Sequence, residues 1–198
     1  VPEDSPLQHL GERKGKKVAV TKAAGAHYLQ NAALNKAGLK FSDIQPAYLS
    51  PADGRAAFEN QKVDAWVTWE PFLSGVRRQL PTRTLADGSG LASYKRYYLT
   101  STSYAQAHPE VLKLVYAQLG EAGTWVKNHP RDAAQVLGPL WGNLDAETVE
   151  AANAHRSYQI QPVAADQLGE QQKIADAFFA EGLLPKKIDA QDVGIWRP

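Results

Sequence analysis

The sequence contains no cysteine and no methionine among its 198 residues. Without cysteine the chain can form no disulfide, offer no thiolate to a metal and use no cysteine nucleophile. This absence is compatible with an exported protein. Without an initiator methionine, we expect Val1 to lie inside a longer product that has been processed or truncated.

An excess of charge of one sign and long apolar runs are also missing. The 22 basic and 21 acidic residues almost cancel, so no strong field attracts nucleic acid or an anionic membrane. No run approaches the ~20 apolar residues that a membrane-spanning helix needs, and no charged-then-apolar signal segment opens the chain. We expect a soluble globular protein with no nucleic-acid partner, whose export signal has already been removed.

Three short β-prone runs alternate with helical segments in the first third of the chain. Residues 17–21 precede a small-residue turn and then a helical apolar spacing over residues 26–37, which Gly38 ends. β character returns over residues 44–49 and again over residues 63–67. This order of strands and helices predicts a βαβαβ unit.

The second helix of this unit has a clear start signal. Ser50 is a suitable N-cap, Pro51 suits the first helical position and Asp53 lies in the first turn, so the helix should run to about Gln61. Right-handed crossovers then force a parallel sheet with helices on its faces. The predicted fold class is therefore α/β, with a parallel-rich sheet, flanking helices and a helical C-terminal part.

The second half of the chain is predicted to be mainly helical. Helices are expected after Pro109, over residues 145–155 and over residues 163–181, and the segment after Pro185 should be extended. Residues 96–101 are β-prone, and we expect them to join the sheet as an additional strand.

The turn between the first strand and the first helix is the clearest candidate for a binding site. Ala24, Gly25, Ala26 and His27 stand where free backbone amides and the helix dipole attract anions, and their small side chains let an oxyanion approach the backbone. A sulfonate, phosphate, sulfate or carboxylate would suit this turn. Many turns of this kind bind nothing, so an ordinary turn is an equal alternative.

The histidines offer one further candidate contact and no metal site. His27 could donate to an anion from the first helical turn, or be a solvated or locally bonded side chain. The other four histidines are far apart and lack the spacing of metal ligands. We therefore predict neither a metal nor a cofactor.

Aromatic residues gather after the third strand, at the end where open α/β sheets hold their ligands. Trp69 could form part of a pocket wall around a ligand's tail and Glu70 a rim hydrogen bond, although a packed Trp69 and a solvated Glu70 are the alternatives. The chain has no G-x-S-x-G elbow, no H-E-x-x-H and no P-loop. Nothing in the sequence indicates an enzyme.

Four stretches resemble one known family, the aliphatic sulfonate-binding proteins of ABC importers, within the nitrate, sulfonate and taurine group of type II periplasmic binding proteins. Together the stretches extend over nearly the whole chain. They are Lys14–Val20 with Gly25–His27, Leu34–Pro46, Leu49–Phe58 with Val63–Trp66 and Trp69–Pro71, and Leu183–Asp189 with Ile195–Trp196.

The resemblance implies two α/β lobes that close on a ligand, with the first ~100 residues absent from this chain. Residues 1–127 would form one lobe with a hinge-proximal N-terminal tail, and residues 128–198 a helical segment that returns toward the missing lobe. The family commonly has a serine or a second glycine where this chain has Ala23 and Ala24, so a hydroxyl contact to the anion is not expected. Arg13 stands where an apolar residue is expected.

The function implied is non-covalent binding of a small organic sulfonate for delivery to a membrane permease, by a monomer in the periplasm. The sulfonate head would lie on the amides of residues 24–27, and Trp69 would contact the tail. Two alternatives stay open: binding of another small oxyanion ligand such as nitrate or taurine, and an enzyme on the same scaffold, either a desulfinase or a thiamine-pyrimidine synthase. Enzymes of that kind use cysteine, which this chain lacks.

Overall fold

The computed structural model describes residues 1–93 and 95–198. The chain divides into two compact units, Val1–Lys95 and Arg96–Pro198. The sequence placed a lobe boundary at residue 127 instead, and how the lobes of the complete protein divide stays a prediction. Each unit is described by itself.

The first unit is built on a three-stranded parallel sheet. β1 (Lys17–Val20) lies in the middle, between β2 (Gln45–Tyr48) and β3 (Ala65–Val67). Val20, the last residue of β1, pairs with Tyr48 on one side and Val67 on the other. The predicted βαβαβ unit and its parallel direction are confirmed.

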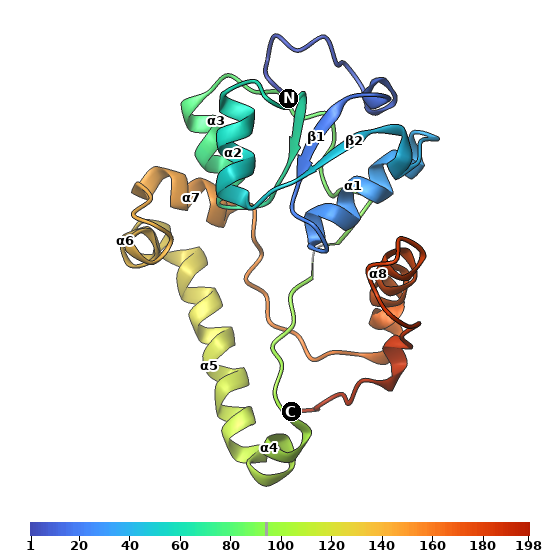
Figure 1. Ribbon diagram of the computed structural model, residues 1–198. Coiled ribbons are helices and arrows are strands. Elements are labelled where there is room, and N and C mark those ends of the chain that lie inside the picture. The colour runs from blue at the N-terminus through green and yellow to red at the C-terminus, as the bar shows by residue number, and fades with distance from the viewer. Residues whose placement is uncertain (94) are drawn as a thin grey trace. The chain divides into compact units, whose positions relative to one another are not determined.

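Three helices flank this sheet, with α1 on one side and α2 and α3 on the other (Figure 1). α1 (Gly25–Lys36) ends before Gly38, which adopts a φ of 71° as predicted. α2 (Pro51–Glu59) begins after Ser50, whose hydroxyl accepts a hydrogen bond from the Asp53 amide at 3.2 Å. α3 (Phe72–Gln79) follows β3.

Apolar side chains fill both faces of the sheet because successive strand residues point to opposite sides. Val18 packs with Leu34 of α1 on one face, whereas Ala19 packs with Phe58 of α2 on the other. α2 approaches closely, because a Cβ on Gly54 would lie 2.7 Å from Nε1 of Trp66. The helices therefore cover both faces of the sheet at the central strand β1, whereas β2 is largely exposed.

The second unit is helical. Its helices are α4 (Thr102–Ala107), α5 (Pro109–Asn128), α6 (Pro130–Leu140), α7 (Ala146–Ala154) and α8 (Gly169–Ala180). The ammonium group of Lys127 on α5 donates to the carbonyls of Asn153 and Arg156 at 3.3 and 2.9 Å, which ties α5 to the end of α7. The helix expected over residues 163–181 is divided into a 3-10 turn, Ala165–Leu168, and α8.

The prediction of a strand over residues 96–101 is wrong. These residues form neither strand nor helix before α4 begins at Thr102, and Tyr98 and Leu99 are largely exposed. Strand preference depends on packing against a neighbouring strand. The segment has no strand partner within the described residues, so its β-prone residues do not form a strand.

Arg13 is a buried arginine that contacts α1. Arg13 is only 3% exposed, and its guanidinium donates from Nη1 to Oε1 of Gln30 on α1 at 2.5 Å and from Nε to the Leu10 carbonyl at 3.3 Å. Desolvation lowers the pKa of Arg13 to about 10. Within the described residues, Nη2 of Arg13 and Nε2 of Gln30 are buried and lack an acceptor. The charge is thus held in the interior by one amide side chain and one carbonyl.

Removing both polar side chains should stabilise the protein. Replacing a buried ionic group by apolar residues of similar size is often stabilising, whereas removing only its partner leaves the charge unsatisfied. Arg13→Met combined with Gln30→Leu is expected to raise the free energy of unfolding by about 1–3 kcal/mol. Gln30→Leu alone should lower it by about 3 kcal/mol, as measured by urea unfolding at pH 7.

The exposed Lys14→Met is the control for loss of one positive charge in the same segment, and it should change the free energy of unfolding by less than about 0.5 kcal/mol. A double variant less stable than the wild type would show that the guanidinium contributes favourably.

Candidate functional site

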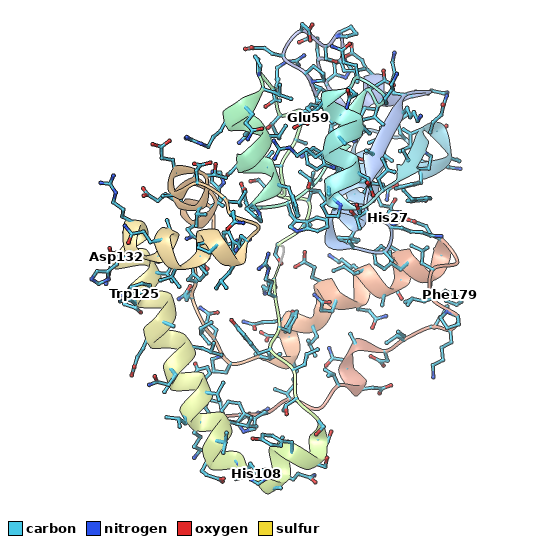
Figure 2. The ribbon with its side chains drawn as sticks, turned by 60° about the vertical axis from the view of Figure 1, so that its left-hand side comes forward. His27, Glu59, His108, Trp125, Asp132 and Phe179 are labelled. Carbon is cyan, nitrogen blue, oxygen red and sulfur yellow. The ribbon has the colours of Figure 1, made fainter. Side chains whose placement is uncertain are left out.

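The parallel register brings the ends of all three strands to one edge of the sheet. Because Val20, Tyr48 and Val67 are paired neighbours, the residues that follow them start out side by side. In Figure 2, His27 near the start of α1 lies at this edge, and Glu59, the last residue of α2, lies at the opposite end of the unit. The predicted site residues after β1 and after β3 therefore share one edge.

The turn before α1 has an unusual backbone at its tip. Ala23 adopts a φ of 56°, a left-handed conformation that costs a non-glycine residue about 1 kcal/mol. Ala24 is then extended, and α1 begins at Gly25. This conformation turns the backbone sharply from strand into helix.

The backbone amides at this turn fall into two sets. The amides of His27 and Tyr28 both donate to the Ala24 carbonyl, at 2.9 and 3.2 Å. In the part of the chain that the structure describes, the amides of Ala24, Gly25 and Ala26 donate to no acceptor. Gly25 is exposed and Ala24 is half-buried, whereas Ala26 is only 2% exposed. These N–H groups lie at the positive end of a helix of 12 residues, and that of Gly25 belongs to an exposed residue.

The side chain of His27 supports this turn from inside. It is fully buried, its Nδ1 accepts a hydrogen bond from the Ala23 amide at 3.0 Å, and its ring lies 4.6 Å from that of Phe41. Desolvation, and secondarily the charge of Lys22, lowers the pKa of His27. A neutral imidazole is required for Nδ1 to accept. His27 therefore fixes the left-handed residue in place, and its side chain is not part of the exposed surface.

The residues after β3 are arranged around the start of α3. Trp69 is half-buried and meets Phe72 edge to face, with ring centroids 5.9 Å apart. Oε2 of Glu70 accepts a hydrogen bond from the Ser74 amide at 3.0 Å, in the first turn of α3. Trp69 and Glu70 thus lie on the predicted edge, and Glu70 also has a local role in capping α3. Their contact with a ligand stays a prediction.

Two residues that sequence reasoning missed also lie at this edge. Lys22 is exposed, and its Nζ is 5.3 Å from the centroid of the Tyr48 ring. The sequence contained the information needed to find this pair. In a parallel sheet the predicted strand over residues 44–49 ends beside the predicted strand over residues 17–21. Tyr48 therefore had to lie beside the turn that contains Lys22.

The described residues contain neither a cluster of metal ligands nor a candidate membrane-spanning helix. No group of histidine and carboxylate side chains there could hold a metal ion. None of the helices in the same residues combines the length and apolar content that crossing a membrane requires.

Residues 1–133 match the family model described as NMT1/THI5 like. The chain belongs to the NMT1/THI5-like family. A curated relative of this NMT1/THI5-like chain, the putative aliphatic sulfonates-binding protein of Escherichia coli K12, is 38% identical over 199 residues. That alignment covers 100% of the chain and 62% of the relative.

The NMT1/THI5-like chain has the fold of solved periplasmic binding proteins. The periplasmic aliphatic sulphonate binding protein SsuA from E. coli matches with a TM-score of 0.93 and 38% identity, over 100% of this chain and 64% of that one. The alkanesulfonate-binding protein SsuA from Xanthomonas axonopodis pv. citri, bound to MOPS, matches with a TM-score of 0.83 and 37% identity, over 95% and 65%. The predicted periplasmic-binding-protein fold is confirmed.

The NMT1/THI5-like chain spans less than two thirds of the length of these relatives. The desulfurization enzyme DSZB also matches, with a TM-score of 0.68 at 14% identity. A likeness at that identity shows the shared fold alone, so it gives the enzyme alternative no support.

The hydrogen bond that the buried His27 ring accepts from the Ala23 amide predicts a loss of stability in acid. Because burial lowers the pKa of His27 below its ordinary value of 6.5, the unfolded chain binds more protons than the folded one as the pH falls below about 6.5. The free energy of unfolding should therefore be lower at pH 5 than at pH 7.5 in urea titrations.

Two histidine variants test this assignment. His27→Gln keeps an acceptor for the Ala23 amide without a titrating ring, so it should show a smaller fall between the two pH values. His129→Gln, at an exposed position of the second unit, should keep the wild-type fall. Equal falls in the wild type and His27→Gln would contradict the role given to His27.

Proposed function

We propose that the complete protein is the periplasmic solute-binding component of an ABC importer and binds a small organic sulfonate at the edge where β1 ends. The names of the E. coli and Xanthomonas relatives support this ligand class. The observation that carries the proposal is that, within the described residues, the amides of Ala24, Gly25 and Ala26 donate to no acceptor at the start of α1.

The chemistry of the turn suits a compact oxyanion. Helix N-termini bind anions because their free N–H groups and the helix dipole both favour negative charge. A sulfonate presents three oxygens on one sulfur, so several of these donors can be used at once. The buried ring of His27 accepts from the Ala23 amide and so holds the backbone of this turn in place.

The aromatic residues after β3 supply a surface for the ligand's carbon tail. Trp69 follows β3 on the same edge and is only half-buried, so part of its ring is available. Glu70 is fixed by its bond to Ser74 and would form the rim. A ligand with an anionic head and a short apolar tail therefore fits this arrangement better than a plain inorganic anion.

Binding is proposed to be coupled to lobe closure. A ligand favours the closed form when it contacts both lobes only in that form. Residues 1–127 are proposed to supply one lobe and residues 128–198 to return toward the other. The closed monomer would then deliver its ligand to the membrane permease, with no catalytic step, no cofactor and no nucleic acid.

Calorimetry of the complete protein tests the ligand class. Titration with ethanesulfonate, taurine, nitrate and sulfate should give the tightest binding for a sulfonate. Binding of nitrate or of a pyrimidine without any sulfonate would overturn the proposal. Release of sulfite from an aryl sulfinate would show instead that the enzyme alternative is correct.

A proline substitution tests the amide donors directly. Gly25→Pro removes one N–H at the first helical position, where proline is well tolerated, and Ala24 before it is already extended, as a residue before proline must be. A hydrogen bond to a charged group contributes about 1.5–3 kcal/mol. Sulfonate binding measured by calorimetry should therefore weaken by roughly 10- to 100-fold.

The matched control is Ala146→Pro, which places proline at the first position of α7 after the extended Asp145. It should fold and bind the sulfonate as the wild type does. If Gly25→Pro also binds like the wild type, the amides at the start of α1 do not hold the anion.

A further inference from the structure

Lys22 carries a positive charge to the edge of the sheet where α1 begins. It lies between Thr21, which follows β1, and Ala23, the left-handed residue of the turn. Its Nζ is 5.3 Å from the centroid of the Tyr48 ring, within the range of a cation–π contact. Tyr48 pairs with Val20, so this contact joins the ends of β2 and β1.

The Tyr48 ring is held firmly enough to position a lysine. On its inner side it lies against the ring of His27, with centroids 5.6 Å apart, and it is parallel to Phe41 within 7° at 6.5 Å. Its exposed fraction is 44%. One side of the ring is therefore supported by the core, and exposed surface remains for the ammonium group.

Lys22 is an exposed positive charge. Among residues 1–93 and 95–198, no carboxylate forms an ion pair with Lys22, and its recorded partner is the Tyr48 ring. By contrast, Arg55 on α2 is bonded to Glu59 at 2.6 Å. A flexible lysine side chain normally loses considerable conformational entropy when it binds a ligand. Prior contact with an aromatic ring reduces that loss.

We propose that Lys22, positioned by the Tyr48 ring, is a second contact for the anionic head of the ligand, beside the amides of α1. The amides supply directional hydrogen bonds and Lys22 supplies the ionic attraction. Lys22 is thus a specificity-determining residue that favours ligands with a full negative charge. This inference rests on the proposed sulfonate site and adds the source of its charge selectivity.

Calorimetry of the complete protein with ethanesulfonate, at low and high salt, tests the inference. Lys22→Met keeps the length of the side chain and removes its charge, so the dissociation constant should rise about 10-fold at low salt. Its dependence on ionic strength should also be weaker than that of the wild type, which a merely structural role would not cause.

Two Tyr48 variants separate the ring from the hydroxyl. Tyr48→Phe keeps a face for the ammonium group and should bind within 2-fold of the wild type, whereas Tyr48→Leu should bind about 3- to 5-fold more weakly. Adding Tyr48→Leu to Lys22→Met should cause no further loss, because the ring acts through the lysine. A full additional loss in the double variant would overturn the positioning role of Tyr48.

Lys36→Met is the matched control, since Lys36 is an exposed lysine at the opposite end of α1. It should leave both affinity and salt dependence unchanged. If the wild type binds ethanesulfonate and Lys22→Met binds it equally well, this inference fails while the proposed function stands. If the wild type binds no sulfonate at all, the proposed function and this inference fail together.

Discussion

Parallel pairing of β1 with both of its neighbours is the constraint on which the rest of the first unit depends. Parallel strands all end at the same side of a sheet, so the loops that follow them are neighbours even when they are far apart in sequence. Val20 between Tyr48 and Val67 fixes this alignment. Without that register, Lys22, Tyr48 and Trp69 would have no common location.

In the candidate site, a buried side chain supports the backbone, and backbone amides supply the hydrogen-bond donors. The ring of His27 and its bond to the Ala23 amide hold the backbone from below. Among the described residues, the amides of Ala24, Gly25 and Ala26 donate to no acceptor, because a helix N-terminus has no preceding turn to accept from them. Rigid support and unsatisfied donors are the two requirements for an anion site built from backbone alone.

The elements of the first unit could be predicted because local signals agreed with the tertiary structure. Ser50 and Pro51 start α2, Gly38 ends α1, and both act through backbone geometry that needs no distant partner. The segment over residues 96–101 could not be predicted in this way. Its β-prone residues need a neighbouring strand, and a single sequence does not show whether one is present.

The candidate site could also be predicted only in part. The small-residue turn and Trp69 were identified because strand ends mark ligand edges. The buried position of His27 and its acceptor role were not, because a histidine in the first turn of a helix can point inward or outward with the same sequence. Lys22 was passed over because its partner, Tyr48, belongs to another strand.

The close approach of α2 has a consequence for how the ligand preference of the proposed site could change. Trp66 fills the space beside Gly54, and Leu34 is completely enclosed on the other face. The helices thus cover the central strand β1, in which Val18, Ala19 and Val20 are at most 1% exposed. The proposed recognition is therefore placed at the ends of the strands. On the proposed function, changes in a few connecting residues would alter selectivity, while the layered interior that keeps the protein folded would remain the same.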